Sequence, residues 1–333
     1  MKPENDLRNN LKSIRTRLGM SQQDLANLAG VTRQTISGVE SGQYAPSVAI
    51  TLRLAKALGC GVEDLFWLEQ DLPIVEAVPT QSFPYAQQMR VSLARVGGEW
   101  IAYPLIGDYA FRTEMIPADG ESVRINVPTG HHQTGKDLVQ VRLLNDLEKL
   151  HHTVVLAGCA PVLSLWARAT ERWHPELRVY WNFANSMAAL HSLRRGEVHM
   201  AGTHLYESKT GEHNVPFVRD VLKGKAAVLI AFGVWEEGLL VQSGNPMGFK
   251  TVADLAQAGV TIVNREVGAG SRLLLERKLQ DEKVPFEAVK GFDRIVCSHQ
   301  DVAQAVLAGV ADAGISTASV AATFGLGFIP LHQ

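Results

Sequence analysis

The chain has 333 residues, of which 46% are hydrophobic and 20% charged, and this composition excludes a disordered or fibrous protein. Its length suits two or three domains, and no apolar run approaches the ~18–20 residues needed to span a bilayer. The three cysteines, Cys60, Cys159 and Cys297, match neither a zinc spacing nor a disulfide framework. Because the N-terminal residues also lack an apolar leader, we expect a cytoplasmic protein with no membrane partner and no metal site.

The charge is unevenly distributed along the chain. Residues 1–60 carry eight Lys and Arg against four acids, so this segment is at +4 while the remainder is at −6. A basic segment on an acidic body is typical of a phosphate-binding module joined to a soluble sensor. A solvated basic face would give the same charge pattern.

Four short helices are predicted in residues 1–70. Apolar residues at helical spacing from Leu7 to Leu18 predict the first helix, which Gly19 ends. Hydroxyl residues that can cap a helix precede the other three: Ser21, Thr32 and Ser47. The fourth helix has an apolar stripe formed by Val48, Leu52, Ala55 and Leu58. Short helices separated by a tight turn that contains glycine are typical of the helix-turn-helix.

Three stretches of this segment carry a resemblance to a known family: Ile14–Ala26, Val31–Ser37 and Glu40–Gly42. They resemble the Cro/C1-type (XRE) helix-turn-helix, and the match extends over residues 7–65. The resemblance implies a buried ion pair between Arg15 and Glu40 that ties the first helix to the third. It also implies that Gln22 contacts a DNA phosphate.

The residues of the third helix independently indicate DNA binding. The N-terminal side chains of the second helix of such a pair enter the major groove, and here they are Thr32, Arg33, Gln34 and Ser37. Arg can pair bidentately with guanine and Gln with adenine; a solvated face on a protein-interaction module is the alternative. One head offers only a small interface, so we expect a homodimer on palindromic double-stranded operator DNA.

Residues 71–148 have a different character. Prolines separate short alternating runs such as Met89–Val96, and Gly97-Gly98 before Trp100–Pro104 predicts a hairpin. We expect a small β-rich segment that links the head to the next domain or pairs subunits. The pairs His131-His132 and His151-His152 are interpreted as loop histidines, because no second ligand pair lies at a suitable spacing from either.

Residues 149–333 alternate between predicted strands and helices. The strands are predicted from apolar runs, which include Thr153–Gly158, Val198–Gly202, Val228–Phe232, Val260–Asn264 and Ala313–Ile315. Such alternation implies parallel sheets covered by helices, with ligands at the carboxyl ends of strands. The segments Leu193–Thr203 and Val306–Ser316 echo one another, which indicates two related lobes around a cleft. We place lobe 1 at about 149–236 plus the C-terminal return and lobe 2 at about 237–314.

A second resemblance covers residues 153–329. It rests on Ala201–Leu205, Asn214–Phe217, Gly238–Val241, Gly244–Pro246, Asn264–Arg272 and Ala311–Gly314. These segments resemble the periplasmic-binding-protein superfamily, in the branch that is fused to helix-turn-helix heads and related to molybdate-binding proteins. The resemblance implies a two-lobed type II α/β domain that senses a ligand. The family often has acidic or hydroxyl residues after the first strand, where this chain has Cys159-Ala160.

The segment Gly268–Arg272 has the features of an anion site. It turns from a strand into a helix, where backbone N–H groups point outward at the positive end of the helix dipole. It lacks the Lys-Ser/Thr pair of a Walker loop and the third glycine of a dinucleotide motif, and an ordinary tight turn is the alternative. The complete predicted ligand site comprises Cys159, Ser186, Thr203, His204, Gly270, Ser271, Arg272 and Ser316.

Some of these residues also have simpler interpretations. Ser186 suits a plain helix cap, and Cys159 suits a small buried residue better than a nucleophile. Three tryptophans are expected in the core: Trp166, Trp173 and Trp235.

We therefore expect a ligand-responsive transcriptional regulator that binds a small anionic effector, with molybdate and tungstate as leading candidates. Neutral N–H and hydroxyl donors suit a dehydrated oxyanion, whereas Arg272 would equally suit a small organic acid. Apart from such a bound effector, no cofactor is expected. An enzyme on a two-lobed fold is a further alternative, but the sequence shows no nucleophile elbow and no recognisable base–nucleophile spacing, so we expect no catalysis.

Overall fold

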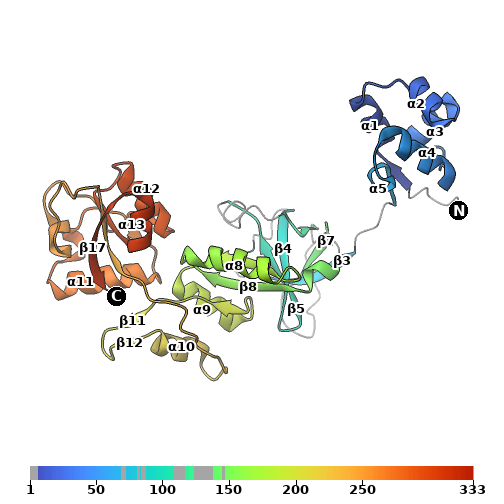
Figure 1. The fold of residues 1–333 in the computed structure, drawn as a ribbon. Coiled ribbons are helices and arrows are strands. Elements are labelled where there is room, and N and C mark those ends of the chain that lie inside the picture. Colours follow the sequence, from blue (N-terminus) through green and yellow to red (C-terminus); the bar gives the residue numbers. More distant parts are fainter. Residues whose placement is uncertain are drawn as a thin grey trace. The chain divides into compact units, whose positions relative to one another are not determined.

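The computed structural model describes residues 7–68, 73–80, 83, 88–107, 117–123, 138–144 and 147–332 (Figure 1). The chain divides into two compact units, Met1–Pro73 and Ile74–Gln333. Among the described residues, no helix has the length and apolar character that a membrane span requires. The predicted loop histidines His131 and His132 lie outside the described residues.

The N-terminal unit is helical. Its helices are α1 (Leu11–Arg17), α2 (Gln22–Ala29), α3 (Arg33–Glu40), α4 (Val48–Leu58) and α5 (Val62–Leu65). The three predicted hydroxyl caps are confirmed, because Ser21, Thr32 and Ser47 each accept a hydrogen bond from the backbone N–H three residues further on. The predicted start of the first helix is wrong. Leu7–Asn9 form strand β1, which pairs with β2 (Phe66–Leu68), so α1 begins only at Leu11.

The predicted apolar stripe of α4 is confirmed for Ala55 and Leu58 and wrong for Val48 and Leu52. Leu54, Ala55 and Leu58 lie in the core of the unit, but Val48 and Leu52 are 77% and 56% exposed. The helix carries two apolar stripes, and the one through Leu54 and Leu58 packs inward. The sequence pattern alone does not decide between two such stripes.

The C-terminal unit begins with a closed barrel. Its strands, in barrel order, are β3 (Ile74–Pro79), β5 (Glu99–Pro104), β4 (Arg90–Val96), β6 (Gly120–Ser122) and β7 (Val139–Leu143). The predicted hairpin is confirmed, since Val96 pairs with Glu99 across Gly97-Gly98. Both glycines have positive φ, at +60° and +89°, which favours glycine at these turn positions.

The barrel shares a core with a parallel sheet of order β10-β8-β9. The strands are β8 (Thr153–Gly158), β9 (Arg178–Phe183) and β10 (Met200–Ala201). Ile101 and Tyr103 of the barrel pack with Val155 of the sheet, and Arg178 Nη2 donates to Asp119 Oδ2 at 2.8 Å. The segment that we predicted to be a bridge is therefore an integral part of lobe 1.

Helices α8 (Val162–Trp173) and α9 (Ser186–Arg195) flank this sheet (Figure 1). Asn185, not Ser186, caps α9, because its side chain accepts the N–H of Ala188 at 3.0 Å. The prediction of Trp173 as a core residue is wrong, since it lies at the end of α8 and is 77% exposed. The remaining elements of lobe 1 are α7 (Leu147–Leu150), β11 (Tyr206–Glu207), β12 (Glu212–His213) and α10 (Val215–Leu222).

Lobe 2 is built on an antiparallel sheet of order β16-β13-β17, where parallel pairing was expected. Its strands are β13 (Glu237–Val241), β16 (Ala313–Thr317) and β17 (Gly327–His332), with a separate parallel pair of β14 (Asn264–Arg265) and β15 (Ile295–Val296). The helices are η1 (Val252–Ala256), α11 (Gly270–Asp281), η2 (Phe286–Ala288), α12 (His299–Leu307) and α13 (Ala318–Phe324). Leu239, Leu275 and Ile315 lie in its core.

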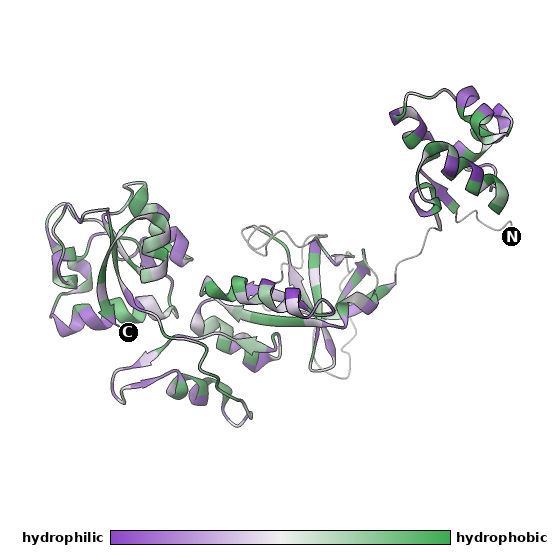
Figure 2. Cartoon of the chain, in the orientation of Figure 1, coloured by the Kyte–Doolittle hydropathy of each residue, from purple (hydrophilic) through white to green (hydrophobic). Residues whose placement is uncertain are grey.

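The predicted strand Val228–Phe232 is not a strand in the structure. The segment between α10 and β13 has no regular secondary structure, and it is hydrophobic over most of its length (Figure 2). Val228, Ile230 and Val234 are 87%, 77% and 79% exposed. An apolar run in a sequence predicts a buried segment but does not say what covers it. Among the described residues, no strand pairs with this segment.

Candidate functional site

Helix α3 presents the side chains that were predicted to read DNA. Arg33, Gln34 and Ser37 are exposed, while Ile36 and Val39 on the opposite face are buried. Thr32 is also exposed, but its Oγ1 accepts the N–H of Thr35 at 3.1 Å. The exposed face therefore offers one guanidinium, one amide and one hydroxyl to a groove, with Thr32 fixing the start of the helix.

The implied ion pair between Arg15 and Glu40 is present. Arg15 Nε donates to Glu40 Oε1 at 2.6 Å and Nη2 donates to Oε2 at 3.2 Å, and the two side chains are only 11% and 5% exposed. Gln22 donates its amide to Glu40 Oε2 at 2.8 Å, so here the side chain completes the pair rather than pointing freely outward. Burial would raise the pKa of Glu40, but the hydrogen bonds from Arg15 and Gln22 hold it below its ordinary value.

A cavity of about 1220 Å³ lies in the C-terminal unit and is lined by both lobes. Lobe 1 contributes Cys159, Thr203 and His204, and lobe 2 contributes Glu237 and Gly270. The exposed apolar segment before β13 also borders it. This cavity corresponds to the cleft that the sequence predicted between two lobes.

Loops after the strands of lobe 1 bring several predicted residues together. Cys159 follows β8 directly, and His204 follows β10. Ser186, at the start of α9, accepts the backbone N–H of His204 at 3.2 Å. A Cβ on Gly270 would lie 2.2 Å from the carbonyl oxygen of His204, so only glycine lets α11 approach lobe 1 this closely.

Side chains from both lobes form a chain of polar contacts in the cleft. His204 lies with Nε2 at 3.4 Å from Cys159 Sγ and with Nδ1 at 3.5 Å from Glu237 Oε1. Ser271 Oγ donates to the same Glu237 oxygen at 2.9 Å. Predicted residues Cys159, His204 and Ser271 are therefore joined through Glu237, which the sequence analysis missed.

A second histidine, His299, extends this chain. It is 1% exposed, its Nδ1 lies 3.1 Å from Ser316 Oγ, and its ring centre lies 5.7 Å from that of His204. Ser316 is thus placed at the cluster, as predicted, but its hydroxyl also donates to the backbone oxygen of His299. Its role here is to orient the imidazole.

The cluster strongly perturbs its own ionisation. Burial would raise the pKa of the Cys159 thiol, but His204 and then His299 hold it well below the ordinary value. Burial would lower the pKa of His204, yet Glu237 and Cys159 raise it to about 10. Burial would raise the pKa of Glu237, and His204, followed by His299 and Ser271, lowers it to about 2. The group is therefore a set of buried charges that stabilise one another.

Arg265 is a buried cation beside Cys159, and the sequence analysis missed it as well. It is 1% exposed, with Nε and Nη2 donating to Glu266 at 2.9 and 3.1 Å. Nη1 has no hydrogen-bond partner among the described residues. Burial opposes the charge, but Glu266 and Cys159 raise the pKa of Arg265. One signal could have found it, because it directly follows the apolar run that ends at Asn264, at the carboxyl end of a predicted strand.

Two predicted ligand residues direct their side chains elsewhere. Arg272 Nε donates to Glu276 at 2.7 Å, and its guanidinium lies 5.1 Å from the centre of the Phe292 ring. Thr203 Oγ1 donates to Asn214 at 2.9 Å. Arg272 therefore does not direct its charge into the cavity, and its Nη1 donates to the Arg265 carbonyl oxygen at 3.2 Å.

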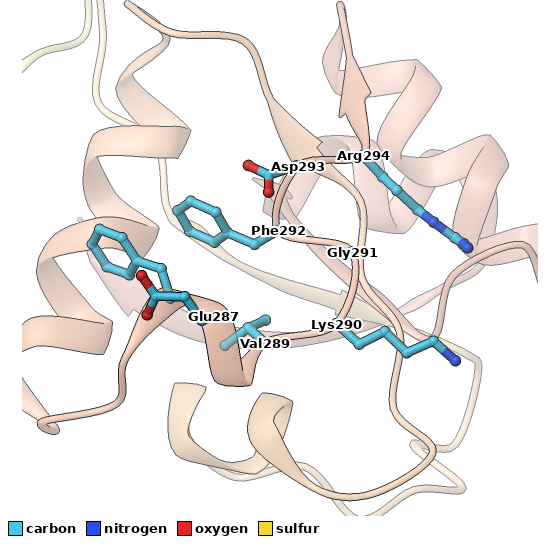
Figure 3. Close-up of a pocket in the computed structure, with 8 residues that line it drawn as sticks. Glu287, Val289, Lys290, Gly291, Phe292, Asp293 and Arg294 are labelled. Carbon is cyan, nitrogen blue, oxygen red and sulfur yellow. The ribbon is translucent and has the colours of Figure 1, made fainter.

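A second hollow of about 610 Å³ lies along residues 286–294 of lobe 2. Glu287 and Phe292 lie to one side of this loop, and Lys290 and Arg294 extend to the other (Figure 3). Phe292 is stacked on Phe286 at 4.7 Å. The charged groups diverge instead of converging on one point, so this hollow is a weaker candidate than the cleft.

Two family models match different parts of the chain. The helix-turn-helix family matches residues 11–65, and the PBP superfamily domain matches residues 167–333. Residues of the head are 43% identical over 65 residues to the HTH-type transcriptional regulator YgzD of Bacillus subtilis, covering 20% of this chain and 98% of that protein.

Two further similarities cover about half of the chain each. The protein YvgK of B. subtilis is 36% identical over 149 residues, and the match spans 45% of this chain but only 48% of YvgK. A phosphate ABC transporter substrate-binding protein from Clostridium perfringens has a TM-score of 0.40 at 16% identity, over 53% of this chain and 74% of that one. This structural likeness is too slight to argue from.

The relatives of the head that carry a functional name are transcriptional regulators, in agreement with the expectation of a non-enzyme. The chain belongs to the PBP superfamily through its C-terminal half, and it joins this domain to the DNA-binding helix-turn-helix of HTH-type transcriptional regulators.

Proposed function

We propose that this protein is a cytoplasmic, homodimeric regulator that binds operator DNA through α3 and responds to a small anion in the cleft. One observation carries the sensing part of the proposal. Arg265 is almost fully buried, yet its Nη1 has no hydrogen-bond partner among the residues that the structure describes. An unsatisfied buried donor is costly, and more so when it is charged, so a site of this kind favours an acceptor supplied by a ligand.

The features that favour an anion are the guanidinium of Arg265 and two helix starts of lobe 2, whereas the Cys159 thiolate and the Glu237 carboxylate oppose an anion placed next to them. Helix α11 begins at Gly270 and α12 begins at His299, and helix N-termini carry partial positive charge. A guanidinium matches the oxygens of an oxyanion or a carboxylate in a fork geometry. Oxyanions such as molybdate and tungstate are the leading candidates, and a small organic acid is the alternative.

Binding can be linked to regulation through the two lobes. Lobe 1 and lobe 2 both line the cavity, so a ligand that contacts both binds the closed arrangement more tightly than the open one. This difference in affinity is the free energy available to change the conformation. By linkage, the affinity for the operator and the affinity for the anion then change each other by the same factor.

Calorimetry on the full chain tests the proposal with molybdate, tungstate, sulfate, phosphate and a set of small carboxylates. We expect one of these classes to bind, and Arg265→Gln to weaken binding at least tenfold. The matched control is Arg294→Gln, which removes an exposed guanidinium of the same lobe at the hollow along residues 286–294. Fluorescence anisotropy with labelled promoter DNA should then show an operator affinity that changes with the bound anion. Equal binding by both variants would refute the role of Arg265.

A further inference from the structure

Three potential metal ligands converge in the cleft although they are far apart in the sequence. Cys159, His204 and His299 each offer one ligand atom, and these atoms all lie within 4.8 Å of one another. They come from the loop after β8, the loop after β10 and the first turn of α12. Their side chains are shielded from solvent, with Cys159 at 2% exposed and His299 at 1%.

We propose that Cys159, His204 and His299 form a binding site for a zinc-class transition-metal dication. A thiolate and imidazoles are the ligands that Zn²⁺ prefers, and they exclude harder cations such as Mg²⁺ and Ca²⁺. The 3.4 Å between Cys159 Sγ and His204 Nε2 fits a shared ion. Tetrahedral Zn²⁺ with ordinary Zn–S and Zn–N bonds separates sulfur and nitrogen by about 3.5 Å.

In both imidazoles the nitrogen that does not face the thiol is turned toward a polar oxygen, and that of His299 makes a hydrogen bond while that of His204 makes none within the described residues. His204 turns Nδ1 toward Glu237 at 3.5 Å, and Glu237 in turn accepts from Ser271 at 2.9 Å. His299 has Nδ1 at 3.1 Å from Ser316 Oγ, which leaves its Nε2 for a metal. Metal-binding histidines regularly contact a carboxylate or another polar oxygen through the second ring nitrogen, and this contact fixes the ring orientation.

The charge of the cluster also matches a dication. The Cys159 thiolate and the Glu237 carboxylate contribute two negative charges, whereas Arg265 and Glu266 form an ion pair with no net charge. Binding through a neutral imidazole releases the His204 proton to solvent, and the dication then takes over its charge beside the thiolate and the carboxylate. Buried charges are stable only when they are paired or coordinated.

Three protein ligands leave one coordination position of a tetrahedral metal open. Cys159 and His204 line the cavity, so a small molecule can reach that position. If the proposed function is correct, the anion could fill it beside Arg265, and this last step alone rests on that proposal. The metal site itself does not.

The test uses the full chain, freed of metal by a chelator and then titrated with Zn²⁺ against a chromophoric competitor and with Co²⁺ by absorption. We expect one metal per chain and a thiolate-to-cobalt charge-transfer band. Cys159→Ser should abolish the band and weaken Zn²⁺ binding at least tenfold, and Glu237→Gln should weaken it about 10–100-fold. The control is Cys60→Ser, which changes a cysteine of the N-terminal unit and should leave both readouts unchanged.

Folding is checked separately. Metal-free Cys159→Ser should keep a cooperative melting transition, and the additional stabilisation that Zn²⁺ gives the wild type should be lost. Absence of stoichiometric metal, or a charge-transfer band that survives in Cys159→Ser, would overturn the metal site. Anion calorimetry on metal-free and Zn²⁺-loaded protein keeps the two proposals apart, because anion binding without any metal binding would leave the proposed function standing.

Discussion

Replacing Arg15 with alanine should lower the free energy of unfolding of the N-terminal unit, whether or not DNA is present. Glu40 is 5% exposed at its side chain, and without Arg15 only Gln22 still donates to its carboxylate. Breaking a buried pair by removing one partner costs about 3–5 kcal/mol. A domain of this size has a total stability of only about 3–9 kcal/mol at ~0.05–0.15 kcal/mol per residue, so Arg15→Ala should remove a large share of the stability of this unit.

Differential scanning calorimetry on the full chain measures this effect as a shift of the transition that belongs to the N-terminal unit. Arg17→Ala is the matched control, because Arg17 is exposed on the same helix and such substitutions usually stay within ~0.5 kcal/mol. A variant that melts like the wild type but loses operator affinity would refute the structural role and place Arg15 on the DNA backbone.

The same pair makes the stability of this unit depend on pH. The pKa of Glu40 is lower in the folded state than its ordinary value, so the stabilisation is present above the ordinary pKa. It is lost as the pH falls through the folded pKa. In Arg15→Ala the folded pKa of Glu40 should rise, because the larger of its stabilising hydrogen bonds is gone. Acid unfolding of the wild type at the same pH as the variant would contradict this reasoning.

Three further predictions concern surfaces. Arg33→Ala should relax sequence preference at one base pair by about 1–3 kcal/mol, measured by anisotropy against operators substituted at each position; unchanged preference would exclude Arg33 from base readout. In the homodimer that we propose, Leu52→Lys should weaken self-association and operator affinity without lowering the melting temperature, because Val48 and Leu52 are exposed apolar residues of α4 that a second copy could cover; an unchanged mass in light scattering would contradict this. Ligand binding should slow hydrogen exchange at Val228–Val234, since this exposed apolar segment borders the cavity, and unchanged exchange there would show that closure does not bury it.

The head could be predicted from the sequence nearly to the residue, because its signals are local. A cap such as Ser21 acts on the turn that directly follows it, and Gly30 ends α2 in the left-handed conformation that favours glycine. The errors occurred where contacts with residues far away in the sequence determine the secondary structure. Leu7 lies at helical spacing, but pairing with Leu68 across the unit makes it part of a strand.

The cleft was predicted in outline and missed in its chemistry for the same reason. Proximity to a strand end or a helix start led to Cys159, His204 and Ser271, which the structure brings together around Glu237. Nothing in the sequence distance between Cys159 and His299 indicates that they meet, because the fold brings them together through tertiary contacts. Arg272 was predicted as a ligand residue because it lies at the start of a helix. In the structure it forms an ion pair with Glu276, four residues further along α11.

The buried groups of the cleft also determine how much binding free energy a ligand can contribute to a change of conformation. Moving a two-state equilibrium from 1:99 to 99:1 requires a difference in affinity of about 5.5 kcal/mol. A hydrogen bond to a charged group contributes about 1.5–3 kcal/mol, so two or three bonds made only in the closed arrangement are enough. Arg265 can supply such bonds from lobe 2, and the loop of His204 lies opposite on lobe 1, held by Ser186. A ligand that contacts Arg265 alone would bind but would not select a conformation, so regulation requires an effector large enough to reach both lobes.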